Sequence, residues 1–177
     1  VEQGPAQPGA TMTPRGINAE AVWDMAQGKV VPRPPQLAAE AREVDGAFDG
    51  LLVDWREKGH AVTFAGRDAL PGGETLKLTV TLTSGLVRTV YLDGKTFLER
   101  RHTGVLNLPN GRRFDITIEF DNWRDVDGVK FPFDIMEERT GKEPVVTLVT
   151  YTDKIELNVP MDDALFTAPA AAPAVAK

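Results

Sequence analysis

The sequence predicts a mainly β fold of the α+β class, in which two short helices precede one curved antiparallel meander. From His60 onward, apolar and polar side chains alternate with a period of two, which gives each strand one apolar face. Short segments rich in Gly, Asn and Asp separate these runs and favour tight turns between neighbouring strands. Before His60, the apolar residues recur at helical spacing instead.

Length and charge restrict the classes of protein that fit. A chain of 177 residues is long enough for one sizeable domain. The net charge of -6 repels a phosphate backbone, so no nucleic-acid partner is expected. No apolar run has the ~20 residues needed to cross a bilayer. Because the chain starts at Val1, we expect a processed product or a fragment, and the removal of a signal peptide is compatible with this start.

The N-terminal part of the chain contains the predicted helices. Residues 1–16 are rich in Gly and Pro and are expected to be irregular, whereas residues 17–166 form the predicted single domain. Residues 167–177 make an Ala/Pro-rich C-terminal tail. Within the domain, residues 17–25 fit a short edge strand, and residues 36–44 fit a helix that follows two prolines.

A second helix is predicted just before the meander. Phe48, Leu51, Leu52 and Trp55 have the spacing of a single apolar stripe, and Gly59 suits a left-handed helix end. The strands that follow share the two-residue alternation, and they are expected at residues 74–83, 86–93, 96–106, 112–120, 129–139 and 144–157.

One hairpin can be given a register. A type I′ turn at Asn110–Gly111 would place His102 opposite Glu119, so that charge pairing supports the assignment. The same register sets Arg101 opposite Phe120. This pairing does not fit the pattern, because it places a charged side chain on the apolar face.

The acidic segment "FDNWRDVDGVKFPFD" does not fit a calcium loop. Aligning Gly128 with the invariant glycine of an EF-hand places Trp123 at the first ligand position, and an indole cannot bind calcium. We therefore expect a hairpin turn in which Asp side chains bond the local backbone and Gly128 has a positive φ.

Catalytic and metal-binding candidates are few. Ser84 is the only serine and lies in a predicted turn beside no histidine. His60 and His102 are the only histidines, too few for a three-histidine zinc site. We expect both to have structural or surface roles, with Glu119 as the partner of His102. No cofactor is expected.

Several stretches, taken in order, resemble the outer-membrane lipoprotein-sorting proteins of the LolA-like superfamily. They are "FDGLLVDWREKGHAVTFAGRD", "GGETLKLTVTL", "VRTVYLDGKTFLERR", "FDNWRDVDGVKFPFDI" and "IELNVPMDDALF", and the likeness covers about residues 47–166. The opening helix and first strands usual in that family are not recognised here. The resemblance implies an incomplete barrel, with the helices as a lid over its apolar concave face.

The resemblance also implies which residues would meet a ligand. The lid would contribute Phe48, Leu51, Leu52 and Trp55. The wall of an apolar cavity would be formed by Leu78, Val80, Ile116, Ile118, Phe120 and Phe133. The alternative is that the same residues form an ordinary filled core, because alternation identifies a buried face without saying what it faces.

The first functional hypothesis is a periplasmic carrier or sorting factor that binds lipoprotein acyl chains or another lipid-like ligand. It would exchange that ligand with membrane-associated donor and acceptor proteins and would catalyse nothing. The alternative is a cell-envelope interaction or sensor module with a filled core, and a third is a hydrolase with carboxylates from separate strands. An apolar cavity of a few hundred cubic ångströms under the Trp55 helix would favour the carrier, and a fully packed interior would count against it.

Overall fold

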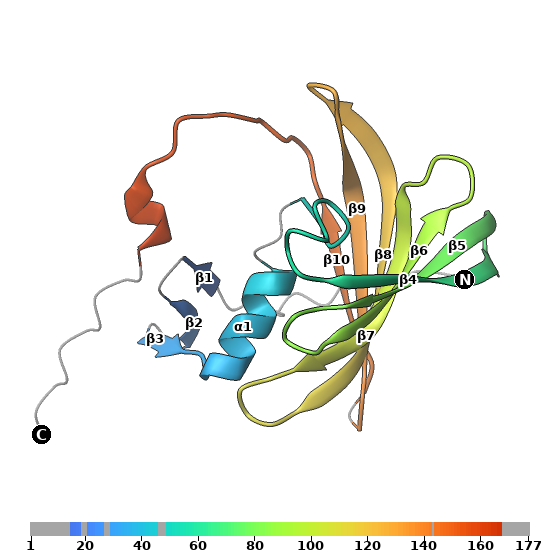
Figure 1. Cartoon of the computed structure of the whole chain (residues 1–177). Helices are drawn as coiled ribbons and strands as arrows, with labels where there is room; N and C mark the ends of the chain where they lie inside the picture. The colour runs from blue at the N-terminus through green and yellow to red at the C-terminus, as the bar shows by residue number, and fades with distance from the viewer. Residues whose placement is uncertain (1–14, 19–20, 27–28, 46–48, 143, 168–177) are drawn as a thin grey trace, which may run out of the picture.

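The computed structural model describes residues 15–18, 21–26, 29–45, 49–142 and 144–167, which form two antiparallel sheets and one α-helix (Figure 1). The elements in chain order are β1 (Arg15–Ile17), β2 (Val22–Ala26), β3 (Lys29–Pro32), α1 (Pro35–Val44), β4 (Ala61–Leu70), β5 (Gly73–Thr81), β6 (Val87–Asp93), β7 (Glu99–Asn107), β8 (Arg113–Val126), β9 (Val129–Thr140), β10 (Val146–Tyr151) and the 3-10 helix η1 (Asp163–Phe166).

The larger sheet contains the predicted meander and also β4, which was not among the six predicted strands. Its seven strands lie in the order β10-β9-β8-β7-β6-β5-β4, so each strand pairs with its neighbour in sequence. The sheet curves without closing, and α1 lies on one side of it (Figure 1). The mainly β class and the incomplete barrel are therefore confirmed.

The smaller sheet precedes α1 and has the order β1-β2-β3. The strand expected at residues 17–25 begins at Val22 and is the central strand of this sheet, not an edge strand. β1 begins at Arg15, inside the segment expected to be irregular. Val22 packs with Ala38 and Ala41 of α1, which joins the small sheet to the helix.

The first predicted helix is confirmed as α1. Pro34 is its N-cap residue, and a proline also occupies its first turn, where a missing N–H costs no intrahelical bond. Ala41 is buried, while Leu37 and Val44 are half-buried on the same side of the helix.

The second predicted helix is wrong. Residues 49–59 form turns and bends, and the backbone leaves the right-handed helical region at Gly50 (φ 81°) and Asp54 (φ 48°). The predicted left-handed end is nevertheless present, because Gly59 has a φ of 76°. There the His60 N–H donates to the Trp55 carbonyl at 2.8 Å, as in a Schellman motif.

The predicted register of the β7–β8 hairpin is wrong by one residue. Arg101 pairs with Glu119, and His102 pairs with Ile118. The Leu108 N–H donates to the Arg112 carbonyl at 2.9 Å, so the loop holds three residues, not two. The shift removes the misfit of Arg101, which lies opposite a carboxylate.

The acidic segment is a turn, as predicted. Asp127 and Gly128 both have positive φ, of 52° and 87°, as a type I′ turn requires. The Asp125 carboxylate accepts the Gly128 N–H at 2.9 Å. This bond, with a further contribution from Lys130, lowers the pKa of Asp125. Within the described residues, no group of His, Asp and Glu is arranged to hold a metal ion.

Helices of the described part of the chain are all too short or too polar to span a membrane.

Candidate functional site

The strand register gathers the predicted wall residues on one side of the large sheet. Leu78 pairs with Val90, Val90 with His102, and His102 with Ile118, and paired residues share a face. Because side chains alternate along a strand, the other predicted wall residues lie on this same side. The apolar face includes Leu78, Val80, Ile116, Ile118, Phe120 and Phe133.

This face is covered by α1 and by residues 49–59, which together are called the cover. Leu51, 5% exposed, forms a core cluster with Val80, Leu82 and Val90. Leu52 packs against the same cluster, whereas Trp55 is half-buried beside the Arg56 side chain, 4.1 Å from its ring centroid. Phe48, the fourth predicted lid residue, lies outside the described residues.

The apolar face is filled in one part and open in another. Under the cover, Val80 is fully buried. Leu78 packs against the same core cluster but is only half-buried, as are Ile118 and Phe120. Phe64 of β4 pairs with Leu78 and so lies on this face, yet it is 59% exposed. We call Phe64, Leu78, Ile118 and Phe120 the open part.

Polar contacts hold α1 to the loop between β5 and β6 and to the end of β7, and sequence reasoning missed them. The Glu43 carboxylate accepts the Ser84 N–H at 3.0 and 3.1 Å, and it also accepts the Thr83 hydroxyl. The Asn107 amide donates to Glu40 at 3.2 Å. Burial raises the pKa of Glu43, but the hydrogen bonds from Ser84 and Thr83 outweigh it, so the pKa lies below its ordinary value.

A buried arginine lies beneath α1. Arg88 is 2% exposed, and its Nη1 donates to the Val105 carbonyl at 2.9 Å. Burial lowers the pKa of Arg88, and the carboxylates of Glu40 and Glu137 oppose this effect. Its Nε has no hydrogen-bond partner among the described atoms. The alternation in "LVRTVYLD" places Arg88 on the apolar side, so the sequence held a signal for it.

The space left beneath α1 is small. A cavity of about 30 Å³ lies between helix residues that include Leu37 and Ala41 and sheet residues that include Arg88 and Leu106. That volume has room for little more than a water molecule. The space beneath α1 is therefore too small for an acyl chain.

His102 lies on the apolar face with a partner other than the predicted Glu119. Its Nδ1 is 2.7 Å from the Glu99 carboxylate, and its ring packs 5.3 Å from that of Phe120, between centroids. Glu119 bonds Arg101 instead, because the corrected register places these two side chains on the opposite face. The partner of His102 is therefore Glu99 and not Glu119, and a structural role for this buried side chain stays a prediction.

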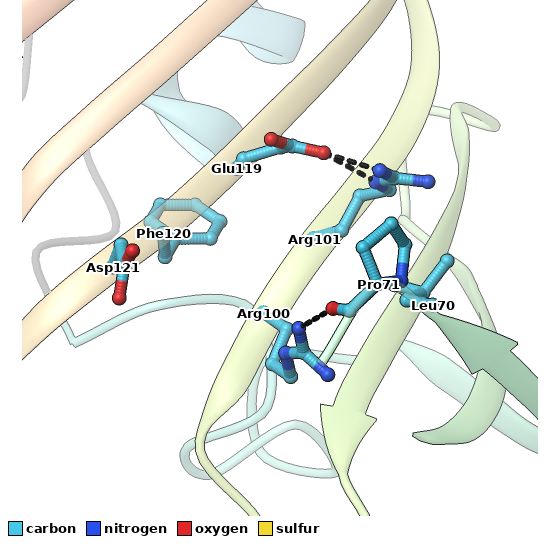
Figure 2. Close-up of a pocket in the computed structure, with 7 residues that line it drawn as sticks. All are labelled: Leu70, Pro71, Arg100, Arg101, Glu119, Phe120 and Asp121. Carbon is cyan, nitrogen blue, oxygen red and sulfur yellow. Dashed lines mark hydrogen bonds and ion pairs between the residues drawn. The ribbon is translucent and has the colours of Figure 1, made fainter. Parts of the chain in front are cut away.

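A larger pocket lies on that opposite face (Figure 2). Its volume is about 260 Å³, and its lining is Leu70, Pro71, Arg100, Arg101, Glu119, Phe120 and Asp121. In Figure 2, Glu119 reaches Arg101, and Arg100 donates to the Pro71 carbonyl. The charged groups are thus largely bonded to protein atoms. Arg101, Glu119 and Asp121 face away from the cover, whereas Phe120, a predicted wall residue, also borders the pocket. Four of the seven lining residues are charged, unlike the lining of the predicted apolar cavity.

Comparison with known proteins identifies the fold. No protein-family model matches the sequence, and no curated protein matches it. Three solved structures are similar, each sharing only 15 or 16% sequence identity with the chain. At this level of identity the likeness concerns the fold alone.

The first similar structure is a LolA superfamily protein from Nitrosomonas europaea, with 16% identity, a TM-score of 0.53, and coverage of 86% of this chain and 68% of that one. The second is described as an outer-membrane lipoprotein-sorting protein domain from Vibrio parahaemolyticus, with 16% identity, a TM-score of 0.51, and coverage of 83% and 64%. The third is a DUF1329 family protein from Desulfovibrio piger, with 15% identity, a TM-score of 0.53, and coverage of 88% and 66%. The chain thus spans about two-thirds of the length of these proteins, and it has a LolA-like fold.

Proposed function

We propose that the protein is a carrier that binds acyl chains of lipoproteins, or another lipid-like ligand, on its apolar face. The observation that carries this proposal is the open part of that face, where Phe64 is 59% exposed beside half-buried Leu78. An apolar surface that continues from a buried core into solvent offers a chain somewhere to lie. The LolA-like fold supports the same function. The proposal includes no catalytic step and no cofactor.

Binding in this proposal requires the cover to move. Sheltering about ten methylenes would contribute on the order of 8 kcal/mol at ~0.8 kcal/mol each. The cavity of about 30 Å³ beneath α1 cannot hold such a chain. The chain would start on the open part and displace Leu51 and Leu52 from the face. Breaking the contacts of Glu43 and Glu40 would offset part of the gain.

The cellular setting is part of the proposal. We infer an exported, periplasmic protein that receives its ligand from a membrane-associated donor and releases it to an acceptor. Support comes from the structural likeness to an outer-membrane lipoprotein-sorting domain. A carrier of this kind needs intermediate affinity, because a ligand bound too tightly could not be passed on.

Binding of a fluorescent fatty acid to a matched pair of variants tests the proposal. Phe64→Asp places a charge on the open part, and we expect affinity to fall roughly tenfold or more, since the charge would have to be desolvated. Val87→Asp is the control, because Val87 is 49% exposed on the opposite face. Equal affinity of the two variants would contradict the proposed site. Mass spectrometry of lipids that copurify with the wild-type protein would identify the ligand class.

A second candidate is a cell-envelope interaction or sensor module with no lipid ligand. The filled core of Leu51, Val80, Leu82 and Val90 favours it, because the cover leaves so little space. Trp55 fluorescence separates the two candidates. A carrier should change this emission when a lipopeptide moves the cover. An unchanged signal, together with no detectable lipid binding, would favour the module.

A further inference from the structure

The two edges of the large sheet differ in their protection against pairing with another strand. At the β4 edge, the register shifts between Phe64 and Gly66, which marks a bulge, and Arg67 and Asp68 follow directly. Bulges and charged residues are devices by which natural proteins keep edge strands from pairing. The β4 edge is therefore protected against pairing with another strand.

The β10 edge has no such protection. The run from Pro144 to Thr152 contains no charged residue. Its register with β9 is continuous from Val146 to Tyr151. Apolar side chains along it are exposed, with values of 55% for Val145, 49% for Val149 and 74% for Tyr151. An uncharged, regular and apolar edge of this kind is a template for strand addition.

Backbone groups of β10 point to the unpaired side at alternate residues. The Thr152 N–H donates to the Phe133 carbonyl at 2.8 Å, which fixes the residues that face β9. In an antiparallel pair, the residues between them direct their N–H and C=O away from that partner. These residues are Thr147, Val149 and Tyr151. Within the described part of the chain, no strand pairs with β10 on this side.

We propose that β10 pairs antiparallel with β10 of a second copy of this chain, about a twofold axis at Val149. In this register, Val149 lies opposite Val149 of the second copy, and Thr147 lies opposite Tyr151 of the second copy. Every outward N–H then meets an outward carbonyl, because both strands present the same three residues. The two sheets become one continuous sheet through an isologous contact.

The chemistry of the strand favours a second copy over a foreign strand. The molecule has a net charge of -6, yet symmetric pairing along β10 places no like charges opposite one another. Met136, 38% exposed, pairs with Val149 and lies on the same face as Arg101, away from the cover. The twofold axis therefore places the exposed side chains of Met136 and Val149 next to the same two residues of the second copy. The apolar face beneath the cover stays available, so the inference is independent of the proposed function.

Sedimentation of the purified full chain over a wide concentration range tests the inference. We expect a reversible dimer. Val149→Lys sets two ammonium groups opposite each other and should raise the dissociation constant of the dimer roughly tenfold or more. Val87→Lys is the matched control, because Val87 is also 49% exposed and belongs to an inner strand of the same sheet. This control should leave the dimer unchanged.

A second variant and a second measurement distinguish a loss of strand pairing from a loss of folding. Thr147→Pro removes one outward N–H and no bond to β9, so it should weaken the dimer while the thermal unfolding midpoint stays near that of wild type. Amide hydrogens of Val149 and Tyr151 should exchange more slowly in the dimer than in the monomer. A protein that stays monomeric at every concentration would overturn the inference. So would a dimer unaffected by Val149→Lys, or a monomer with protected outward amides, which would mean that the chain covers its own edge.

Discussion

The apolar face has two parts that share one sequence pattern and differ in what covers them. Where the cover meets the sheet, Leu51 of the cover and Val80 of β5 are 5% and 0% exposed, and they belong to a single core cluster. In the open part, Phe64 is 59% exposed although it pairs directly with Leu78. Burial stabilises in proportion to the apolar area removed from water. The covered part therefore supports the fold, and the open part has apolar surface left for a ligand.

Truncation of one residue in each part should separate their contributions to stability. Leu51→Ala should lower the free energy of unfolding by about 2–5 kcal/mol, the range for a buried leucine that leaves a cavity. Phe64→Ala, at a largely exposed position, should cost less than about 1 kcal/mol. Urea unfolding measures both. Equal losses would show that the two parts are packed alike in solution, and the contrast would be wrong.

A close contact beneath α1 offers a smaller effect on the covered part. A Cβ at Gly104 would clash with Nη1 of Arg88 and would lie 2.7 Å from its Cδ. Gly104→Ala should therefore cost about 1–3 kcal/mol, because the arginine must shift within a filled space.

The double variant identifies the cause of that loss. When Arg88→Ala is combined with Gly104→Ala, the loss should be smaller than the sum of the single losses, because the truncated side chain no longer meets the new methyl group. Urea unfolding of all four proteins gives the coupling. Additive losses would mean that Gly104 is required for another reason, such as the close approach of an added Cβ to the Val87 carbonyl oxygen, at 3.0 Å.

The meander could be predicted from the sequence, whereas the form of the cover could not. Alternation in the strands is a property of each strand alone, and the pairing of neighbours follows from the short turns. The apolar stripe at Leu51, Leu52 and Trp55 fits a helix equally well as a set of turns. Positive φ at Gly50 and Asp54 separates these possibilities, and spacing does not encode it.

The candidate site was partly visible in the sequence. All six predicted wall residues lie on one face, because alternation assigns faces correctly even where the register is wrong between strands. The misfit of Arg101 opposite Phe120 was itself the signal for a one-residue error, since Glu119 was the adjacent alternative. The extent to which the cover fills the face depends on contacts between distant segments, such as Glu43 with Ser84, which no local pattern predicts.

The smallest expected effect concerns the attachment of the cover and its dependence on pH. The folded protein holds the pKa of Glu43 below its ordinary value, so ionised Glu43 stabilises the fold above the unfolded-state pKa. This contribution is lost as pH falls through the lower folded-state pKa. Glu43→Gln should cost about 1 kcal/mol near neutral pH, since water partly screens these hydrogen bonds.

Unfolding of wild type and Glu43→Gln at a series of pH values measures this contribution. The two stabilities should converge as the solution becomes acidic, because protonation of Glu43 in the wild type removes the charge that the variant already lacks. A difference that stays constant with pH would show that Glu43 acts by packing alone. The carrier proposal adds an expectation: the variant should bind a fatty acid faster than wild type, because its cover is held less firmly over the apolar face.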